Sequence, residues 1–196
     1  MKDSIFKFLQ KNKELLDRPD PLLDELYNNA SYESTFTLGE LTDIFLNRGR
    51  NPLDYMSSVP WNFMRASRYE NPFFTIPKGR GIEEIGKMAF TDSRLGGIMI
   101  SEGIKVVDSF AFSQCPNLEV VYFPSTLEEL GTALFHKTDK IKEIYYNENY
   151  TYFLNHVHIM HGEDDMLNWF RLPAGRADSD CILICKDTKI KLGYNK

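Results

Sequence analysis

Cysteine is scarce in this sequence, and long apolar runs are missing. Three cysteines among 196 residues are an odd and small number, which argues against a disulfide framework and favours a reducing compartment with buried thiols. No apolar run approaches the roughly 20 residues that a membrane-spanning helix needs. The N-terminal stretch MKDSIFKFLQKNKELL mixes charges with apolar residues, so we expect no signal peptide. We therefore expect a cytoplasmic protein with no membrane partner.

An excess of positive charge is also lacking. The chain has 23 basic and 28 acidic residues, for a net charge of −5. Tight binding to nucleic acid needs dense positive charge, so we expect no nucleic-acid partner. The contents of 42% hydrophobic and 26% charged residues are those of a folded protein and exclude a disordered chain.

Short helical segments characterise residues 1–72. Apolar residues at helical spacing predict a helix over residues 2–16 and a second one after Asp20. Thr37 and Glu40 match a capping box that opens a further helix, which Gly49 is expected to end. Two more helical turns are expected after Asn51-Pro52 and after Pro60, and the second of them carries Trp61, Phe63 and Met64.

An internal repeat of 22–23 residues occupies residues 73–146, and Phe74 and Ile76 begin an earlier, partial unit. Its strand positions are Leu95, Ile98 and Ile100, then Leu118, Val121 and Phe123, then Ile141, Ile144 and Tyr146. A second apolar set keeps the same phase: Ile82, Ile85 and Phe90, then Ile104, Val107 and Phe112, then Leu127, Leu130 and Phe135. One unit is too small to bury its own apolar face, so the pattern predicts units that stack into one continuous core.

These units resemble the BspA-type leucine-rich repeat, whose pattern is roughly I-x-x-I-G-x-x-A-F-x-x-C-x-x-L-x-x-I-x-I-P. The matching residues are Gly86, Ala89 and Phe90 in the first unit, Ala111, Phe112, Cys115 and Leu118 in the second, and Gly131, Phe135 and Ile141 in the third. The segment SDCILICKDTKIKL resembles the hairpin that often closes such arrays, near residues 181–192. The resemblance implies a binding surface, with no enzymatic activity and no cofactor.

The fold class that follows is α+β: a short leucine-rich-repeat solenoid between two caps. We expect a helical N-terminal cap over residues 1–72, repeats over 73–146, and a C-terminal cap over 147–196 with a β-hairpin and a short helix around Trp169. Repeat arrays need terminal units that shield the ends of the core, which is the physical reason for expecting caps.

The strand residues that alternate with the core positions should point to the outer face of the sheet. One row across the strands contains Thr75, Met99, Tyr122 and Tyr145, and its neighbour contains Gly97, Val120 and Glu143. Folding does not require methionine and two tyrosines on a solvated face, and such a stacked row makes a contiguous apolar patch. We therefore predict a protein-binding surface at these residues. Alternatively, the N-terminal helices or residues 147–165 cover this face. If the face does not bind the partner, the convex loops near Asp92, Gln114 and Lys137 are the next candidates.

Three histidines form the pattern H-x-H-x-x-H at His156, His158 and His161. On a strand, the first two side chains would share a face and could converge on one metal ion. The competing interpretation is a surface strand with Val157 and Ile159 pointing inward. We expect the second, with no metal bound.

Three functions remain open at this stage. The segment FTLGELTDIFLNRGRNPLDYMSSVPWNFM resembles helical segments that precede such repeats in bacteriophage-encoded proteins. The first hypothesis is accordingly a non-enzymatic interaction module, a phage effector that binds and inhibits or redirects a host bacterial protein in the host cytoplasm. The second is a virion or surface component, such as an adhesin or tail accessory protein. The third is a metal-dependent enzyme that uses the histidine cluster.

Overall fold

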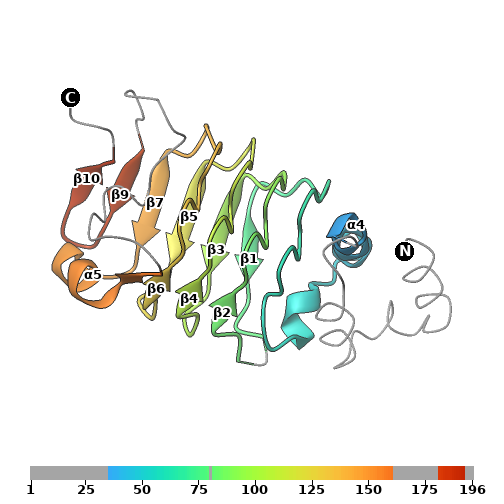
Figure 1. Ribbon diagram of the computed structural model, residues 1–196, viewed down its shortest axis with the longest axis horizontal. Helices are drawn as coiled ribbons and strands as arrows, with labels where there is room; N and C mark the ends of the chain where they lie inside the picture. The colour runs from blue at the N-terminus through green and yellow to red at the C-terminus, as the bar shows by residue number, and fades with distance from the viewer. Residues whose placement is uncertain (1–34, 80, 161–180, 193–196) are drawn as a thin grey trace.

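The computed structural model describes residues 35–79, 81–160 and 181–192, whose chain winds into a solenoid with a β-sheet on each of two sides (Figure 1). The six-stranded sheet has the order β1-β3-β5-β7-β9-β10, and the four-stranded sheet has the order β2-β4-β6-β8. The four coils from β1 to β8 each contribute one strand to each sheet, and β9 and β10 extend the six-stranded sheet. The strands are β1 (Phe74–Ile76), β2 (Glu84–Ile85), β3 (Gly97–Ile100), β4 (Val106–Val107), β5 (Val120–Phe123), β6 (Glu129–Leu130), β7 (Glu143–Tyr146), β8 (His158–Ile159), β9 (Ile182–Ile184) and β10 (Lys189–Lys191).

The core between the sheets consists of the residues that the repeat predicted. The eight strand residues from Leu95 to Ile144 in the aligned columns are at most 5% exposed. Phe90, Phe112 and Phe135 are fully buried and stack in one column through the solenoid, with ring centroids 5.7 Å and 5.8 Å apart. The sequence-based phase of the repeat is therefore confirmed.

Each repeat turns through left-handed backbone at the same two positions. Non-glycine residues rarely adopt positive φ, yet eight of the described ones do so, with φ between 52° and 61°: Asn62, Ala66, Met88, Asp92, Phe110, Gln114, Ala133 and Lys137. Neighbouring coils satisfy the backbone at these turns. The Phe90 N–H donates to the Ala111 carbonyl, for example, and the buried Thr91 hydroxyl donates to the Phe110 carbonyl at 2.9 Å.

Helix α4 (Thr35–Leu46) begins before the predicted capping box. Thr37 and Glu40 lie inside it, so that prediction is wrong; no proline or glycine separates Thr35 from Thr37, and the helix extends across both. The predicted stop is confirmed: Gly49 has φ 71°, its N–H donates to the Leu46 carbonyl, and the Arg50 N–H donates to the Phe45 carbonyl, the pattern of a Schellman motif.

The predicted helical turn after Asn51-Pro52 is also present, as the 3-10 helix η2 (Pro52–Tyr55). The Asn51 side chain accepts a hydrogen bond from the Leu53 N–H at 3.1 Å and so caps this helix. The prediction of a helix after Pro60 is wrong, because the chain there forms turns that pair with the next coil. Val59 bridges to Ile85, and the ring of Phe63 lies 6.0 Å from that of Phe90.

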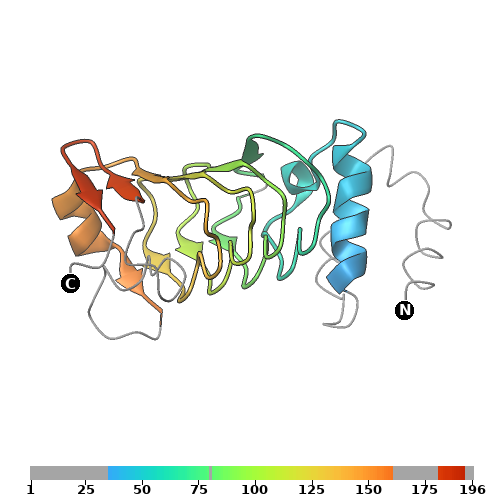
Figure 2. The same ribbon diagram turned by 90° about the horizontal axis from the view of Figure 1, so that it is seen from above.

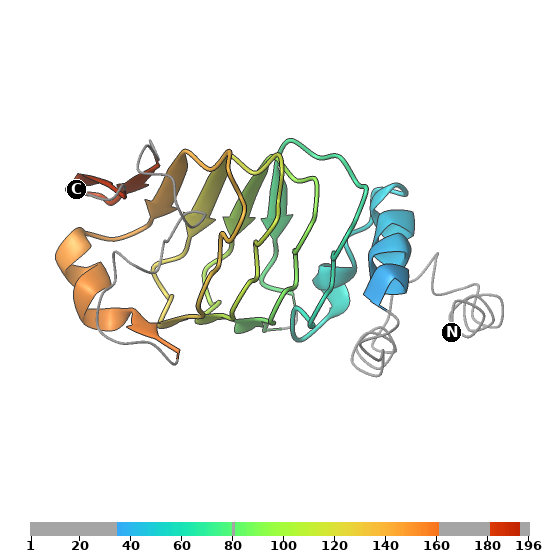
Figure 3. The ribbon, with the colours of Figure 1, turned by 45° about the horizontal axis from the view of Figure 1, so that its top comes forward.

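Helix α5 (Tyr150–His156) follows β7, and Asn149 caps it by accepting from the Tyr152 N–H. The predicted hairpin is formed by β9, which pairs with β7 in parallel, and β10, which pairs with β9 in the antiparallel sense. Helices α4 and α5 lie at opposite ends of the row of strands (Figures 1 and 3). The helices expected within residues 2–27 and around Trp169 lie outside the described residues.

Figure 2 shows the successive coils lying side by side between α4 and the β9–β10 hairpin. None of the described helices is long and apolar enough to cross a lipid bilayer. The division of the chain at residues 72 and 146 stays a prediction.

Candidate interaction surface

The outer face of the six-stranded sheet carries an apolar row that crosses its strands. Thr75 is opposite Met99, Met99 opposite Tyr122, and Tyr122 opposite Tyr145. The same row continues to Ile184 on β9. We call these five residues the central row. Its first four members are the ones that strand alternation predicted, and the fifth was missed because the position of the hairpin in the sheet was not foreseen.

Tyr122 and Tyr145 form the middle of the central row. Their rings are stacked, with centroids 4.4 Å apart and planes within 7° of parallel, because in-register parallel strands hold equivalent side chains at about the strand spacing of 4.8 Å. The Tyr145 hydroxyl donates to the Glu143 carboxylate at 2.8 Å. This hydrogen bond, together with burial and the carboxylate charge, raises the pKa of Tyr145 to about 12. Tyr145 is therefore a neutral hydrogen-bond donor at any physiological pH.

A second row runs beside the first and contains Gly97, Val120, Glu143 and, on β9, Ile182. Gly97 lets a further aromatic residue reach the central row: a Cβ there would meet the Phe73 ring at 2.7 Å. The Phe73 ring lies edge-on to Tyr122, with centroids 5.7 Å apart. Sequence reasoning missed Phe73, although its place just before β1 was a usable signal.

The face is accessible in the described part of the chain. Met99 is 39% exposed and Phe73 is 37% exposed, while Tyr122 and Tyr145 are half-buried. Helices α4 and α5 lie beyond the first and last coils and not across the strands. Of the segments that were expected as alternative covers, the N-terminal helices and residues 147–165, the parts within 1–34 and 161–165 lie outside the described residues.

A cavity of about 570 Å³ opens at the carboxyl ends of the strands. Its floor is Met99, Tyr122 and Tyr145, and its rim includes Glu102 and Lys186. Pockets of this size bind drug-sized molecules or protruding side chains. The central row therefore borders a concave feature along most of its length.

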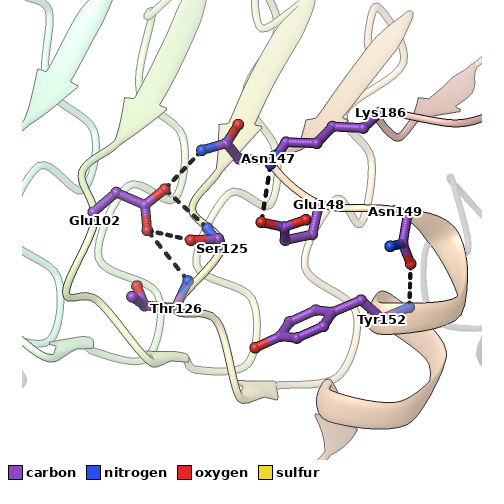
Figure 4. A network of polar contacts seen from close by, with 8 residues as sticks. All are labelled: Glu102, Ser125, Thr126, Asn147, Glu148, Asn149, Tyr152 and Lys186. Carbon is purple, nitrogen blue, oxygen red and sulfur yellow. Dashed lines mark hydrogen bonds and ion pairs between the residues drawn. The ribbon is translucent and has the colours of Figure 1, made fainter.

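Hydrogen bonds that link successive coils hold this rim (Figure 4). The Glu102 carboxylate accepts from the backbone N–H and hydroxyl of Ser125, at 3.0 and 2.8 Å, from the Thr126 N–H at 3.3 Å, and from the Asn147 amide at 2.9 Å. Partial burial alone would raise the pKa of Glu102, but these hydrogen bonds outweigh it and the net shift is downward. Lys186 pairs with Glu148 at 2.9 Å and ties the hairpin to the turn after β7.

The histidines do not lie on one strand as expected. His156 is the last residue of α5, where its ring stacks on Tyr152 with centroids 3.7 Å apart, and β8 begins only at His158. The strand prediction is wrong for His156 because the capped helix continues to it. Val157 is buried and Ile159 is half-buried, as predicted. His161 lies outside the described residues, among which no group of three His, Cys, Asp or Glu side chains could hold a metal ion.

The convex turns and the cysteines lie where the repeat places them. Asp92, Gln114 and Lys137 are exposed, at equivalent left-handed turn positions. The three cysteines are buried thiols outside any disulfide, and burial is the main cause that raises their pKa values, to about 11 for Cys115, 12 for Cys181 and 11 for Cys185. Thiols of this kind are unreactive.

Fold and surface together define a parallel β-solenoid of stacked short repeats with one apolar sheet face. Residues 68–159 match the model of the BspA type leucine-rich repeat region, in six copies. This part of the chain is therefore a BspA-type leucine-rich repeat region, which confirms the resemblance noted in the sequence.

No curated protein matches this chain significantly. Among solved structures, the pneumococcal vaccine antigen PcpA is similar, with 17% sequence identity and a TM-score of 0.36. The similarity covers 48% of this chain and 28% of that one, so this chain spans just over a quarter of the antigen.

Proposed function

We propose that this protein is a non-enzymatic interaction module that binds a protein partner through the outer face of its six-stranded sheet. The observation that carries the proposal is the accessible central row, with its stacked tyrosines. The repeats themselves are of a kind that generally mediates protein–protein interaction, which supports a protein as the partner.

Folding does not account for this row. The core is complete without it, because the inward strand residues alternate with it and fill the space between the sheets. Stacked aromatic residues and a methionine are the residue types enriched at the centres of protein interfaces. Tyr122 and Tyr145 already hold one another in a single arrangement, so binding would cost little side-chain entropy.

The test is the double variant Tyr122→Ala, Tyr145→Ala, measured by calorimetry against the partner captured with the wild-type chain. Hot-spot truncation costs about 2 kcal/mol or more, so we expect at least about a thirtyfold loss of affinity. The matched control is Tyr55→Ala, since Tyr55 is 41% exposed and lies outside the central row. Unchanged affinity in a double variant that melts like the wild type would refute the proposal and direct attention to the convex turns at Asp92, Gln114 and Lys137.

We also propose that the ends of the array are capped, by helical structure within residues 1–72 and by the hairpin within 147–196. The position of α4 beside the first coil and the pairing of β9 with β7 support this, because a solenoid core needs protection at both ends. Deletion of β10 together with β9 should then lower solubility as well as stability.

The biological setting that we propose is a bacteriophage effector that inhibits or redirects a host protein in the bacterial cytoplasm. Its support is the resemblance of the segment before the repeats to phage-encoded proteins. The alternative is an adhesin or a tail accessory component. The time of expression after infection separates them, since an effector is made early and a virion component late.

A further inference from the structure

The two rows of the outer face do not end with the apolar residues but continue onto β10. Lys189 is opposite Ile184, and Lys191 is opposite Ile182. Directly opposed residues of an antiparallel pair lie on the same face of a sheet. Lys189 therefore lies next to Ile184 at the end of the central row, and Lys191 lies next to Ile182 at the end of the second row.

This arrangement gives the face two chemically different parts. The part over β1, β3, β5 and β7 is apolar and aromatic, and the edge over β10 is cationic. Glu143, the acidic residue nearest to this edge in the second row, accepts the hydrogen bond from Tyr145. Lys189 is exposed and has no hydrogen-bond or ion-pair partner among the described residues. On a chain whose net charge is −5, such a cationic edge is a local feature of this face.

We propose that the partner presents an extended acidic segment that crosses the strands, with apolar side chains over the central row and carboxylates over Lys189 and Lys191. This inference rests on the proposed function and specifies the chemistry of its ligand. Charge complementarity carries it: an apolar surface alone would accept many segments, whereas lysines at one end favour carboxylates there and fix the direction of binding.

The strand spacing sets the length of the segment. Neighbouring strands are about 4.8 Å apart, so the two steps from Tyr145 to Lys189 span roughly 10 Å, and an extended peptide covers that in about three residues at 3.3 Å each. The four steps from Met99 to Lys189 span roughly 19 Å, or about six residues. The expected ligand thus has two bulky apolar residues followed, about three residues later, by Asp or Glu.

The experiment uses the full chain and a displayed library of random peptides about ten residues long, matched to the span above. Peptides are selected on the wild-type protein and depleted on the variant Tyr122→Ala, Tyr145→Ala. We expect the enriched peptides to combine apolar residues with Asp or Glu at the stated separation. Enrichment of peptides that lack acidic residues would overturn the inference. The absence of any peptide that depends on the two tyrosines would count against both the inference and the proposed function.

One enriched peptide is then synthesised with a fluorescent label and titrated against charge-reversal variants. Lys189→Glu with Lys191→Glu should weaken binding about tenfold or more at low salt, and the difference should shrink at about 0.5 M NaCl because salt screens exposed charges. The matched control, Lys87→Glu with Lys137→Glu on the convex side, should change affinity by less than about twofold. Replacing the acidic residues of the peptide by their amides should abolish the effect of the lysines.

Equal affinity of the wild type and the lysine variant, with binding still lost in the tyrosine variant, would overturn the inference and leave the proposed function standing. Lysines on an edge strand also hinder sheet-to-sheet association. A variant whose only change is self-association, seen by size-exclusion chromatography, would assign Lys189 and Lys191 to that role and also overturn the inference. If charge reversal disturbs folding, the neutral variant Lys189→Gln with Lys191→Gln replaces it in this experiment. We expect its loss of affinity to be smaller than that of the charge-reversal variant.

Discussion

Substitution of Phe112 by alanine tests the stacking of the repeats most directly. Phe112 is fully buried in the middle coil, and its ring stacks on Phe90 at an interplanar angle of 28° and on Phe135 at 17°. No other ring in this column has stacked neighbours on both sides among the described residues. The substitution therefore removes a contact from three successive coils at once.

The size of the effect follows from this environment. Replacing a buried phenylalanine by alanine lowers the free energy of unfolding by about 3–5 kcal/mol, which includes the cost of the cavity left behind. Each aromatic pair contributes a further 0.5–1.5 kcal/mol or so, part of which is already counted in the burial. We expect about 4–5 kcal/mol, a large share of the 5–15 kcal/mol that is usual for a whole domain.

Urea unfolding monitored by far-UV circular dichroism and by intrinsic fluorescence measures this loss. Coincident transitions establish two-state behaviour, which a repeat array does not guarantee. Phe112→Leu keeps the burial and removes the stacking, so it should cost only about 1–2 kcal/mol and remain folded if the alanine variant does not. A loss below about 1.5 kcal/mol for Phe112→Ala, with an unchanged m-value, would refute the stacked-core reasoning.

Two further predictions concern the rim and the thiols. Because the pKa of Glu102 is lowered in the folded protein, its contribution to stability is present at neutral pH and is lost as the pH falls through the folded-state value; Glu102→Gln should thus be less stable than the wild type at pH 7, and the difference should disappear at a pH low enough to protonate Glu102 in the folded protein. A constant difference across that range in thermal melts would contradict this. Cys115, Cys181 and Cys185 should resist a thiol reagent at about pH 8 in the native protein and react fully in denaturant, whereas rapid labelling of any one of them without denaturant would show that it is not buried.

The repeat region could be predicted from the sequence because its coils share one spacing. When apolar columns recur every 22–23 residues, each coil repeats the same dihedral pattern, and a single interpretation fits all of them. The coil of Val59 and Phe63 was missed because the step from Phe63 to Phe90 is longer than that period, so its apolar residues were read as helical. Its backbone pairs with the following coil, a tertiary contact that propensity does not encode.

Part of the candidate surface could be predicted for the same reason, and part could not. Alternation along the strands is enough to place Met99, Tyr122 and Tyr145 in one row. Placing Ile184 and Lys189 requires knowing that β9 pairs with β7 across an intervening stretch of more than thirty residues. Sequence separation of this size carries no register information, since loop length constrains pairing only weakly.

The stacking that builds the core also concentrates chemistry on the surface. In-register parallel strands align equivalent positions, so any preference at one outward position is repeated at intervals of one strand. In this chain the repetition brings two tyrosines into contact, and the absence of a side chain at Gly97 makes room for Phe73 to join them. Neither feature contributes to the core between the sheets, because the inward-pointing residues already fill it. A surface residue that the core does not need can serve binding at little cost in stability. The aromatic row that leads to the lysines of β10 is the part of this protein that best fits this description.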